Sequence, residues 1–314
     1  MTRWPELDYA SWAPTCDALH MWCQIVGKYR LAHTPWVNHS WHATLYPTPR
    51  GLTTGPVPDG ALSAEVQFDV FDHRLKVMTS DGKEAGFELS AMSVAAFHER
   101  FRETLRTLGL TDTFDGSPNE VADAIPFVAQ TSPGAYDGAA VQRFVRALLT
   151  ISEVFETFRT GYLGKVSPVH LFWGSFDLAV TRFSGATAPL HPGGFPNLPD
   201  DVTREAYSHA VSSAGFWPGN GGGPIQEACF YSYASPSPEG FASAKVAPAA
   251  ARFDERLSEF VVTYDAIRAS ATPDEDLLQF LETTYSAAAD LGGWDRAALD
   301  CPRGKPRVVR PITA

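Results

Sequence analysis

The sequence has no excess of positive charge, no long hydrophobic run and no apolar leader. Its 314 residues include 25 Lys and Arg against 36 Asp and Glu, which gives a formal net charge of −11. An acidic chain has no general electrostatic attraction to nucleic acid or to an anionic membrane. No stretch approaches the roughly 18 apolar residues that span a bilayer, and the first residues lack the apolar segment of a signal peptide. We therefore expect a cytoplasmic protein whose partner is neither a nucleic acid nor a membrane.

Motifs that mark many catalytic or metal sites are also missing. The cysteines show no C-x-x-C or zinc-ribbon spacing, so we expect small buried thiols in a reducing cytosol. The chain has no G-x-S-x-G nucleophile elbow, no phosphate loop ending in G-K-[ST] and no G-x-G-x-x-G after a strand. These absences argue against a serine or cysteine nucleophile and against a nucleotide-binding loop. The glycine-rich segment 218–224 is expected to be either a flap or a plain turn.

The composition and the periodic patterns favour a folded α+β protein. Hydrophobic residues make up 44% of the chain and charged residues only 19%, which is enough for a real core. Apolar residues at helical or alternating spacing predict the elements. The expected helices are 15–26 with Thr15 as a possible N-cap, 94–108, 138–162 capped by Asp137, 253–264, and one from 273 to before 292. The expected strands are 37–48, 64–70, 75–79, 87–89, 169–183, 207–216 and 229–233. We expect antiparallel sheets with helices packed on one face.

The order of elements divides the chain into two similar parts. We expect an N-terminal α+β half over 1–110, a linker or surface loop over 111–137 and a C-terminal α+β half over 138–314, together forming one compact unit. Trp41 and Trp173 each follow a helix and precede an arginine by nine residues. These repeated positions indicate either an internal duplication or the helix-then-strand order that is common in α+β proteins.

Five blocks of the sequence carry a resemblance to known proteins. They are 19–28, 38–42, 50–54, 168–185 and 205–219. The chain resembles, over nearly its whole length, a family of uncharacterised bacterial proteins, a domain of unknown function of similar length. Two positions depart from that pattern: Ser40 stands where a second Trp is usual, and Ala210 where Glu is usual. The resemblance supports a single unit and implies no activity.

Histidines gather in the blocks rich in Gly, Trp and Pro and suggest a site. On a regular strand over 38–42, His39 and His42 would point to opposite faces. An alignment of Trp41 on Trp173 instead brings His42 and His170 to one face, where His209 could join them. With Asp177, Glu205 or Glu227 as an oxygen ligand, this set is typical of non-haem iron or zinc sites. The alternative is that the histidines are hydrogen-bonded residues of the core or rim.

Two arginines are candidates for orienting an anionic substrate. Arg50 and Arg182 could clamp a carboxylate or phosphate, or could simply form ion pairs with some of the many acids. We expect most of the aromatic residues near the histidines to pack in the hydrophobic core, and some of them could line a pocket.

The first functional hypothesis is a cytosolic small-molecule enzyme with a pocket between the halves. His42, His170 and His209 would be metal ligands or acid–base groups, and Arg50 or Arg182 would hold the substrate. Metal-assisted oxidation or hydrolysis, with one divalent transition metal such as Fe or Zn, is the favoured chemistry. The alternative is a non-catalytic protein that binds a small molecule in the same aromatic pocket. The sequence leaves the oligomeric state open.

Overall fold

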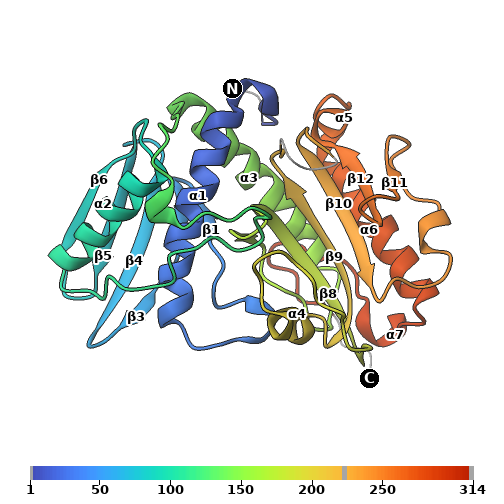
Figure 1. Ribbon diagram of the computed structural model, residues 1–314. Coiled ribbons are helices and arrows are strands. Elements are labelled where there is room, and N and C mark those ends of the chain that lie inside the picture. The colour runs from blue at the N-terminus through green and yellow to red at the C-terminus, as the bar shows by residue number, and fades with distance from the viewer. Residues whose placement is uncertain (1–2, 221–224, 311–314) are drawn as a thin grey trace.

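Two antiparallel sheets of six strands each form the framework of the protein (Figure 1). The computed structural model describes residues 3–220 and 225–310. The N-terminal sheet has the order β1-β2-β4-β5-β6, with β3 also paired to β4. Its strands are β1 (Tyr46–Thr48), β2 (Gly51–Thr53), β3 (Val57–Asp59), β4 (Leu62–Asp69), β5 (Arg74–Thr79) and β6 (Glu84–Glu88). The C-terminal sheet has the order β11-β12-β10-β9-β8-β7. Its strands are β7 (His170–Phe172), β8 (Asp177–Thr187), β9 (His209–Trp217), β10 (Cys229–Ser235), β11 (Arg252–Asp254) and β12 (Glu259–Thr263).

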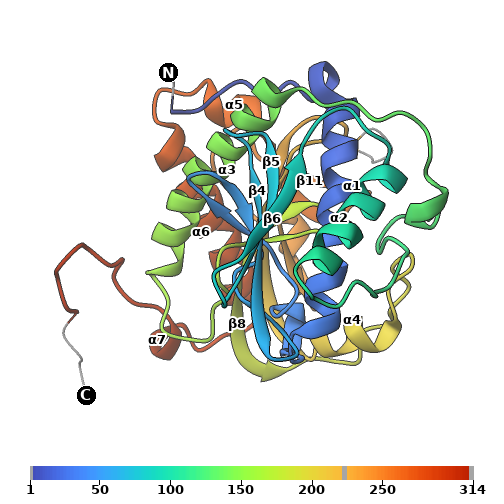
Figure 2. The ribbon, with the colours of Figure 1, turned by 90° about the vertical axis from the view of Figure 1, so that its left-hand side faces the viewer.

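The helices lie between the sheets and along them. They are α1 (Tyr9–His33), α2 (Val94–Thr107), α3 (Gly138–Arg159), α4 (Asp200–Ala206), α5 (Tyr264–Arg268), α6 (Pro273–Leu291) and α7 (Arg296–Leu299), with short 3-10 turns η1 (Asn38–Ser40), η2 (Phe127–Ala129) and η3 (Phe241–Ser243). Figure 2 shows α1 and α2 together on one side of β4, β5 and β6. The expected α+β fold with antiparallel sheets is confirmed. No described helix is long and apolar enough to cross a membrane.

Several local predictions hold because the sequence encodes them locally. The alternation over 64–70 becomes β4, in which Ala64, Val66 and Phe68 are buried. The Asp137 side chain accepts hydrogen bonds from two backbone N–H groups at the start of α3, as an N-cap does. Gly109, with φ +73°, follows the end of α2. Cys16, Cys23 and Cys229 are buried free thiols, whereas Cys301 is half-buried.

Two predicted elements are wrong, and the predicted first helix is confirmed over 15–26 but starts earlier than expected. Residues 38–42 form η1 and the turn that follows it, not a strand, because His39 and Ser40 adopt φ values of 63° and 56°. Residues 253–264 form the β11–β12 hairpin, not a helix, because Ser258 (φ 59°) reverses the chain. The first helix begins at Tyr9, not near Thr15, and contains Pro14; this proline removes only one backbone hydrogen bond near the helix start.

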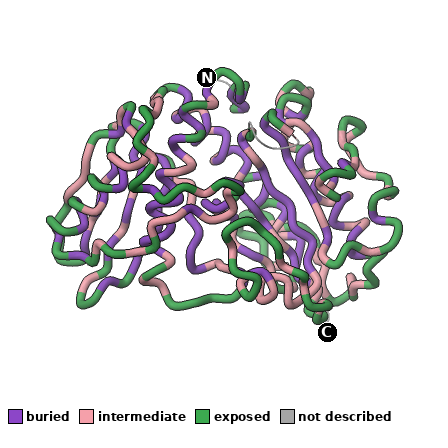
Figure 3. The backbone as a smooth tube through the Cα atoms, in the orientation of Figure 1, coloured by how far each residue is buried: buried purple, intermediate pink, exposed green. Residues whose placement is uncertain are grey.

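The two sheets meet at a short backbone bridge. Leu45 and Leu171 exchange two backbone hydrogen bonds of 2.9 and 2.8 Å. Beside it, Trp173 donates from Nε1 to the Ala43 carbonyl (2.7 Å), and its ring lies where a Cβ on Gly27 would be, 2.3 Å away. The two halves are therefore packed closely here, and Figure 3 shows buried residues continuing through the helices between the sheets.

The two faces of the C-terminal sheet differ in what covers them. Helix α6 contacts β9 and β10, and α3 contacts β8. The side chains on this helix-covered face are fully buried and mostly apolar, including Leu178, Val180, Phe216 and Phe230. Because side chains alternate along a strand, the intervening residues point to the opposite face. Within the described residues no long helix packs there, and this is the face that carries the candidate site.

Candidate functional site

A cavity of about 470 Å³ lies on the face of the C-terminal sheet that α6 does not cover. Strands β8, β9, β10 and β12 form its floor. Its other walls come from η1, α4, the segment around Glu120, the loop around His191 and the β11–β12 turn. The volume is in the range of small-molecule sites. Its lining residues that carry ionisable, aromatic or hydroxyl groups are His39, Ser40, Trp41, Glu120, Phe172, Ser175, Asp177, Thr181, Phe183, His191, Phe195, Thr203, Tyr207, Ser213, Trp217, Tyr231, Tyr233, Ser235, Ser237, Ser258 and Glu259.

Three carboxyl groups from separate elements converge on this cavity, which we call the carboxyl pocket. Glu120 comes from the long segment before α3, Asp177 from the start of β8 and Glu259 from the start of β12. Each carboxyl is held differently, and those differences determine its protonation.

Asp177 is held by two hydroxyl donors. Ser175 donates from Oγ to Oδ1 at 2.6 Å, and Tyr231 donates its hydroxyl to Oδ2. Both oxygens act as acceptors, an arrangement that suits an ionised carboxylate. Burial raises the pKa of Asp177, while the two hydrogen bonds oppose that rise.

A glycine in the middle strand allows this contact. Tyr231 on β10 lies across β9 at Gly215 to reach Asp177 on β8. A Cβ on Gly215 would be 2.3 Å from the tyrosine hydroxyl oxygen, so no larger residue fits without moving the ring. The sheet floor is therefore shaped to place a phenol against a carboxylate.

Glu120 reaches the pocket from a segment with no regular structure. Its φ is 59°, and its backbone N–H donates to the Pro196 carbonyl at 2.9 Å. Its Oε1 lies 1.9 Å from where a Cβ on Gly174 would be. Burial first, and then the nearby charge of Asp177, raise its pKa to about 7.

Glu259 carries the most unusual carboxyl group of the three. It follows Ser258, whose positive φ turns the chain into β12. Burial, followed by the charge of Asp177, raises its pKa to about 8. Its Oε2 is buried and accepts no hydrogen bond within the described residues. A protonated carboxyl at neutral pH is thus available inside the cavity.

Aromatic rings and two histidines complete the walls. The Trp217 ring centroid lies 4.4 Å from that of Tyr231, and the Tyr207 hydroxyl is 2.8 Å from that of Tyr233. The His191 ring stacks on Tyr207 at 4.7 Å. His39 contacts the Ala206 carbonyl through Nδ1 at 2.6 Å. Because a carbonyl only accepts, Nδ1 carries the proton, and burial lowers the pKa of this ring.

Backbone strain is concentrated around the cavity. Of the eight non-glycine residues with positive φ in the described chain, four line the carboxyl pocket: His39, Ser40, Glu120 and Ser258. A fifth, Phe176, lies between Ser175 and Asp177. Each such conformation costs on the order of 1 kcal/mol and is typical of functional sites. This clustering is a second reason, independent of the carboxyls, to place the site here.

The three histidines predicted as ligands lie elsewhere in the structure. His170 is fully buried, contacts Thr44 Oγ1 at 3.1 Å through Nδ1, and has its pKa lowered by burial to about 3. His42 contacts the backbone of Val37. His209 bonds the hydroxyl of the preceding serine. None of the three lines the carboxyl pocket.

The predicted metal set is not assembled. In residues 3–220 and 225–310, no group of three or more His, Cys, Asp or Glu side chains is arranged to hold a metal ion. Asp177 lines the carboxyl pocket, but Glu205 accepts from Trp36 Nε1 at 2.5 Å on the exposed side of α4. The turn at 38–42 removed the strand geometry from which the shared histidine face was inferred.

Both candidate arginines form ion pairs, as the alternative interpretation held. Arg50 pairs with Asp69 (Nε to Oδ2, 2.6 Å) on the N-terminal sheet. Arg182 is 1% exposed, pairs with Glu282 (Nη1 to Oε2, 3.4 Å) and stacks on Phe158, with its guanidinium carbon 3.4 Å from the ring centroid. Neither lines the carboxyl pocket.

Glu120 and Glu259 are not among the site residues predicted from the sequence. Glu120 lies in the predicted linker among other acids, and Glu259 lies in a segment assigned to a helix. For Glu259 the sequence does contain a pattern that indicates the correct element, because Val261, Val262 and Thr263 form a β-branched run that favours a strand. For Glu120 the sequence offers no comparable signal. The segment 218–224, expected as flap or turn, lies from 221 onward outside the described residues.

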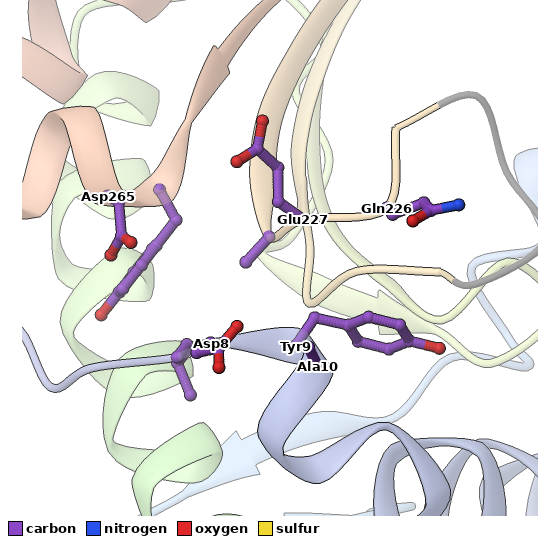
Figure 4. Close-up of a pocket in the computed structure, with 9 residues that line it drawn as sticks. Asp8, Tyr9, Ala10, Gln226, Glu227 and Asp265 are labelled. Carbon is purple, nitrogen blue, oxygen red and sulfur yellow. The ribbon is translucent and has the colours of Figure 1, made fainter.

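A second cavity, of about 190 Å³, lies where the start of α1 meets β10 and α5 (Figure 4). Asp8, Glu227 and Asp265 are on its walls. No described side chain lining it has a buried polar atom without a partner. It is smaller and lacks the buried carboxyls of the first cavity, so the carboxyl pocket is the candidate site.

Comparison with known proteins identifies the family and nothing further. The model of DUF5996, a family of unknown function, matches residues 4–301. The chain therefore belongs to this family, in agreement with the resemblance seen in the sequence. Comparisons with curated proteins and with solved structures yield no significant match.

Proposed function

We propose that this member of DUF5996 is an enzyme that acts on a small organic molecule by acid–base chemistry in the carboxyl pocket. The observation that carries the proposal is the convergence of Glu120, Asp177 and Glu259 on one cavity of about 470 Å³. Groups whose environments drive their proton affinities apart are the usual basis of acid and base roles.

The chemistry follows from the three environments. Asp177, with both oxygens accepting hydrogen bonds, suits the role of a fixed charge. Glu259 and Glu120, with pKa values of about 8 and about 7, can give or take a proton near neutral pH, which is where a general acid or base is most effective. Because Glu259 Oε2 has no hydrogen-bond partner among the described residues, this group is the first candidate to contact a substrate.

A non-catalytic binding protein is the second candidate. Aromatic side chains such as Trp217, Tyr231 and Tyr233 form a large share of the pocket wall, and binding sites are typically apolar with a few polar groups. The predicted catalytic histidines lie outside this pocket, which removes one argument for an enzyme.

One experiment separates the two functions. The purified protein is incubated with a small-molecule cell extract, and mass spectrometry follows both the free solution and the molecules retained on the protein. Glu259→Gln keeps the shape and neutral state of the side chain but removes its proton transfer. Glu255→Gln is the matched control, since Glu255 is exposed in the same β11–β12 hairpin.

The outcomes are distinct. Conversion of an extract component by the wild type and Glu255→Gln, but not by Glu259→Gln, supports the enzyme. Retention of one compound near equimolar amounts without conversion supports the binding protein and rejects the enzyme. If no compound is converted and none is retained, both functions are rejected for this pocket.

A further inference from the structure

The carboxyl pocket differs from two other buried acids of this protein, Asp69 and Asp254, because its carboxyls have no Lys or Arg partner among the described residues. Asp69 is buried against Arg50 and Lys76, with its Oδ2 at 2.6 and 2.7 Å from their nitrogens. Asp254 is buried against Arg252 and Arg256, at 3.1 and 2.7 Å. At these positions the chain supplies its own positive charge.

Glu120, Asp177 and Glu259 receive no such partner. In residues 3–220 and 225–310, no Lys or Arg forms an ion pair with any of the three, and none lines the cavity. Lys165 approaches the other end of the wall, where its Nζ is 4.8 Å from the centroid of the Phe183 ring and 4.9 Å from that of Trp41, and where burial and then its charge lower the pKa of His39. Phe183 is six residues along β8 from Asp177, about 20 Å at the rise of a strand.

Unused hydrogen-bond acceptors are the second feature of the pocket. Glu259 Oε2 and His39 Nε2 are both buried and have no partner among the described residues. With the proton of His39 on Nδ1, its Nε2 can only accept. An unpaired buried polar atom is costly, so a ligand that donates hydrogen bonds would satisfy what the chain leaves open.

Aromatic faces are the third feature. Tyr231 and Tyr233 lie nearly parallel, at 14° with centroids 6.1 Å apart, and Trp217 packs against Tyr231. The faces of such rings attract cations, most strongly when water is excluded. They also bury the apolar body of a ligand.

From these three features we infer that the carboxyl pocket binds an organic cation, a compound that joins an ammonium group to an apolar body. The inference rests on the proposed function only in that both use this pocket. The ammonium group supplies the positive charge that the three carboxyls lack and an N–H donor that Glu259 Oε2 can accept once this carboxyl has given up its proton. The apolar body fits the aromatic wall.

Three probes with the same apolar body test the inference. They are 3,3-dimethylbutylamine, 3,3-dimethylbutan-1-ol and 4,4-dimethylpentanoate, which carry a positive, a neutral and a negative head group. Binding is measured by quenching of tryptophan fluorescence, since Trp41 and Trp217 line the cavity, and by calorimetry. We expect the amine to bind at least about 10-fold more tightly than the alcohol, and the carboxylate to bind most weakly.

Variants tie the preference to the pocket. Glu259→Gln should weaken amine binding by about 30-fold or more, as loss of one partner of a desolvated charged pair does, and leave alcohol binding unchanged. Glu255→Gln should alter neither. A thermal melt of each variant verifies that it is folded.

Failure of this inference is separable from failure of the proposed function. If the alcohol or the carboxylate binds as tightly as the amine, the cation class is wrong and the pocket remains a binding site. If none of the three probes binds, the cation inference is overturned. The extract experiment then decides the proposed function by itself.

Discussion

The carboxyl pocket should make the protein less stable as pH rises, and Glu259→Gln should remove much of that loss. Glu259 keeps its proton in the folded state up to about pH 8. In the unfolded chain a glutamate loses its proton near pH 4.3. Between these values the folded state holds one more proton than the unfolded state, so a rise in pH favours unfolding.

The magnitude follows from the size of this pKa difference. One extra proton in the folded state corresponds to a slope of about 1.4 kcal/mol per pH unit. The pKa of about 8 makes the limit about 5 kcal/mol over the full interval. Glutamine mimics the neutral acid, so the variant should match the wild type near pH 5 and exceed its free energy of unfolding by about 3–5 kcal/mol near pH 8.

Urea unfolding followed by tryptophan fluorescence, repeated from about pH 5 to about pH 9, measures the slope directly. Every other titrating group is common to both proteins, so the difference between the two curves isolates Glu259. The exposed control Glu255→Gln should follow the wild-type curve. Parallel curves for the wild type and Glu259→Gln would show that Glu259 is ionised in the folded state and would refute the reasoning.

Three further predictions concern the floor, the arginine and the ligand. Gly215→Ala places a Cβ 2.3 Å from the Tyr231 hydroxyl oxygen, so it should cost about 1–3 kcal/mol of stability and weaken amine binding. The control Gly116→Ala, whose Cβ would meet nothing within 4 Å, should change neither stability nor binding. Equal effects of the two substitutions would contradict the packing argument. Arg182→Ala removes a buried side chain that stacks on Phe158 and should cost about 2–5 kcal/mol in urea unfolding with amine affinity unchanged. Weaker binding at full stability would instead restore the substrate-clamp hypothesis. Binding of 3,3-dimethylbutylamine near pH 7 should release about 0.5–1 proton from the cavity carboxyls. Calorimetry in buffers of different ionisation enthalpy measures this proton release. If no proton is released, these acids do not face the ligand.

The parts of the fold that the sequence predicted are those whose signals are local. The alternation that became β4 and the Asp137 cap of α3 depend on neighbours within a few residues. The segment 253–264 was wrongly predicted as a helix because the spacing of its apolar residues fits a helical face. In the structure the turn at Ser258 makes it a hairpin. Competing local signals of this kind are resolved by tertiary packing, here by the pairing of β12 with β10.

The candidate site was predicted less well because its contacts are distant in the sequence. Glu120 is placed by the absence of a Cβ on Gly174, and Asp177 by a tyrosine on another strand. Periodicity reports which face a side chain occupies but not which distant glycine makes room for it. The histidines show the opposite error: sequence cannot distinguish a ligand from a buried ring such as His170, which is hydrogen-bonded to Thr44.

The carboxyl pocket lowers the stability of the folded protein, and this loss is itself an argument that the pocket has a function. Two glycines, Gly174 and Gly215, give up side-chain packing so that a carboxyl and a phenol can occupy their place. Backbone strain at Glu120 and Ser258, and a buried oxygen of Glu259 without a partner, add further free energy to the folded state. The chain neutralises the buried Asp69 and Asp254 with its own arginines and lysines, and within the described residues it does not do so here. A ligand that supplies the missing charge and donors would recover part of this cost, which couples its binding to the stability of the folded protein.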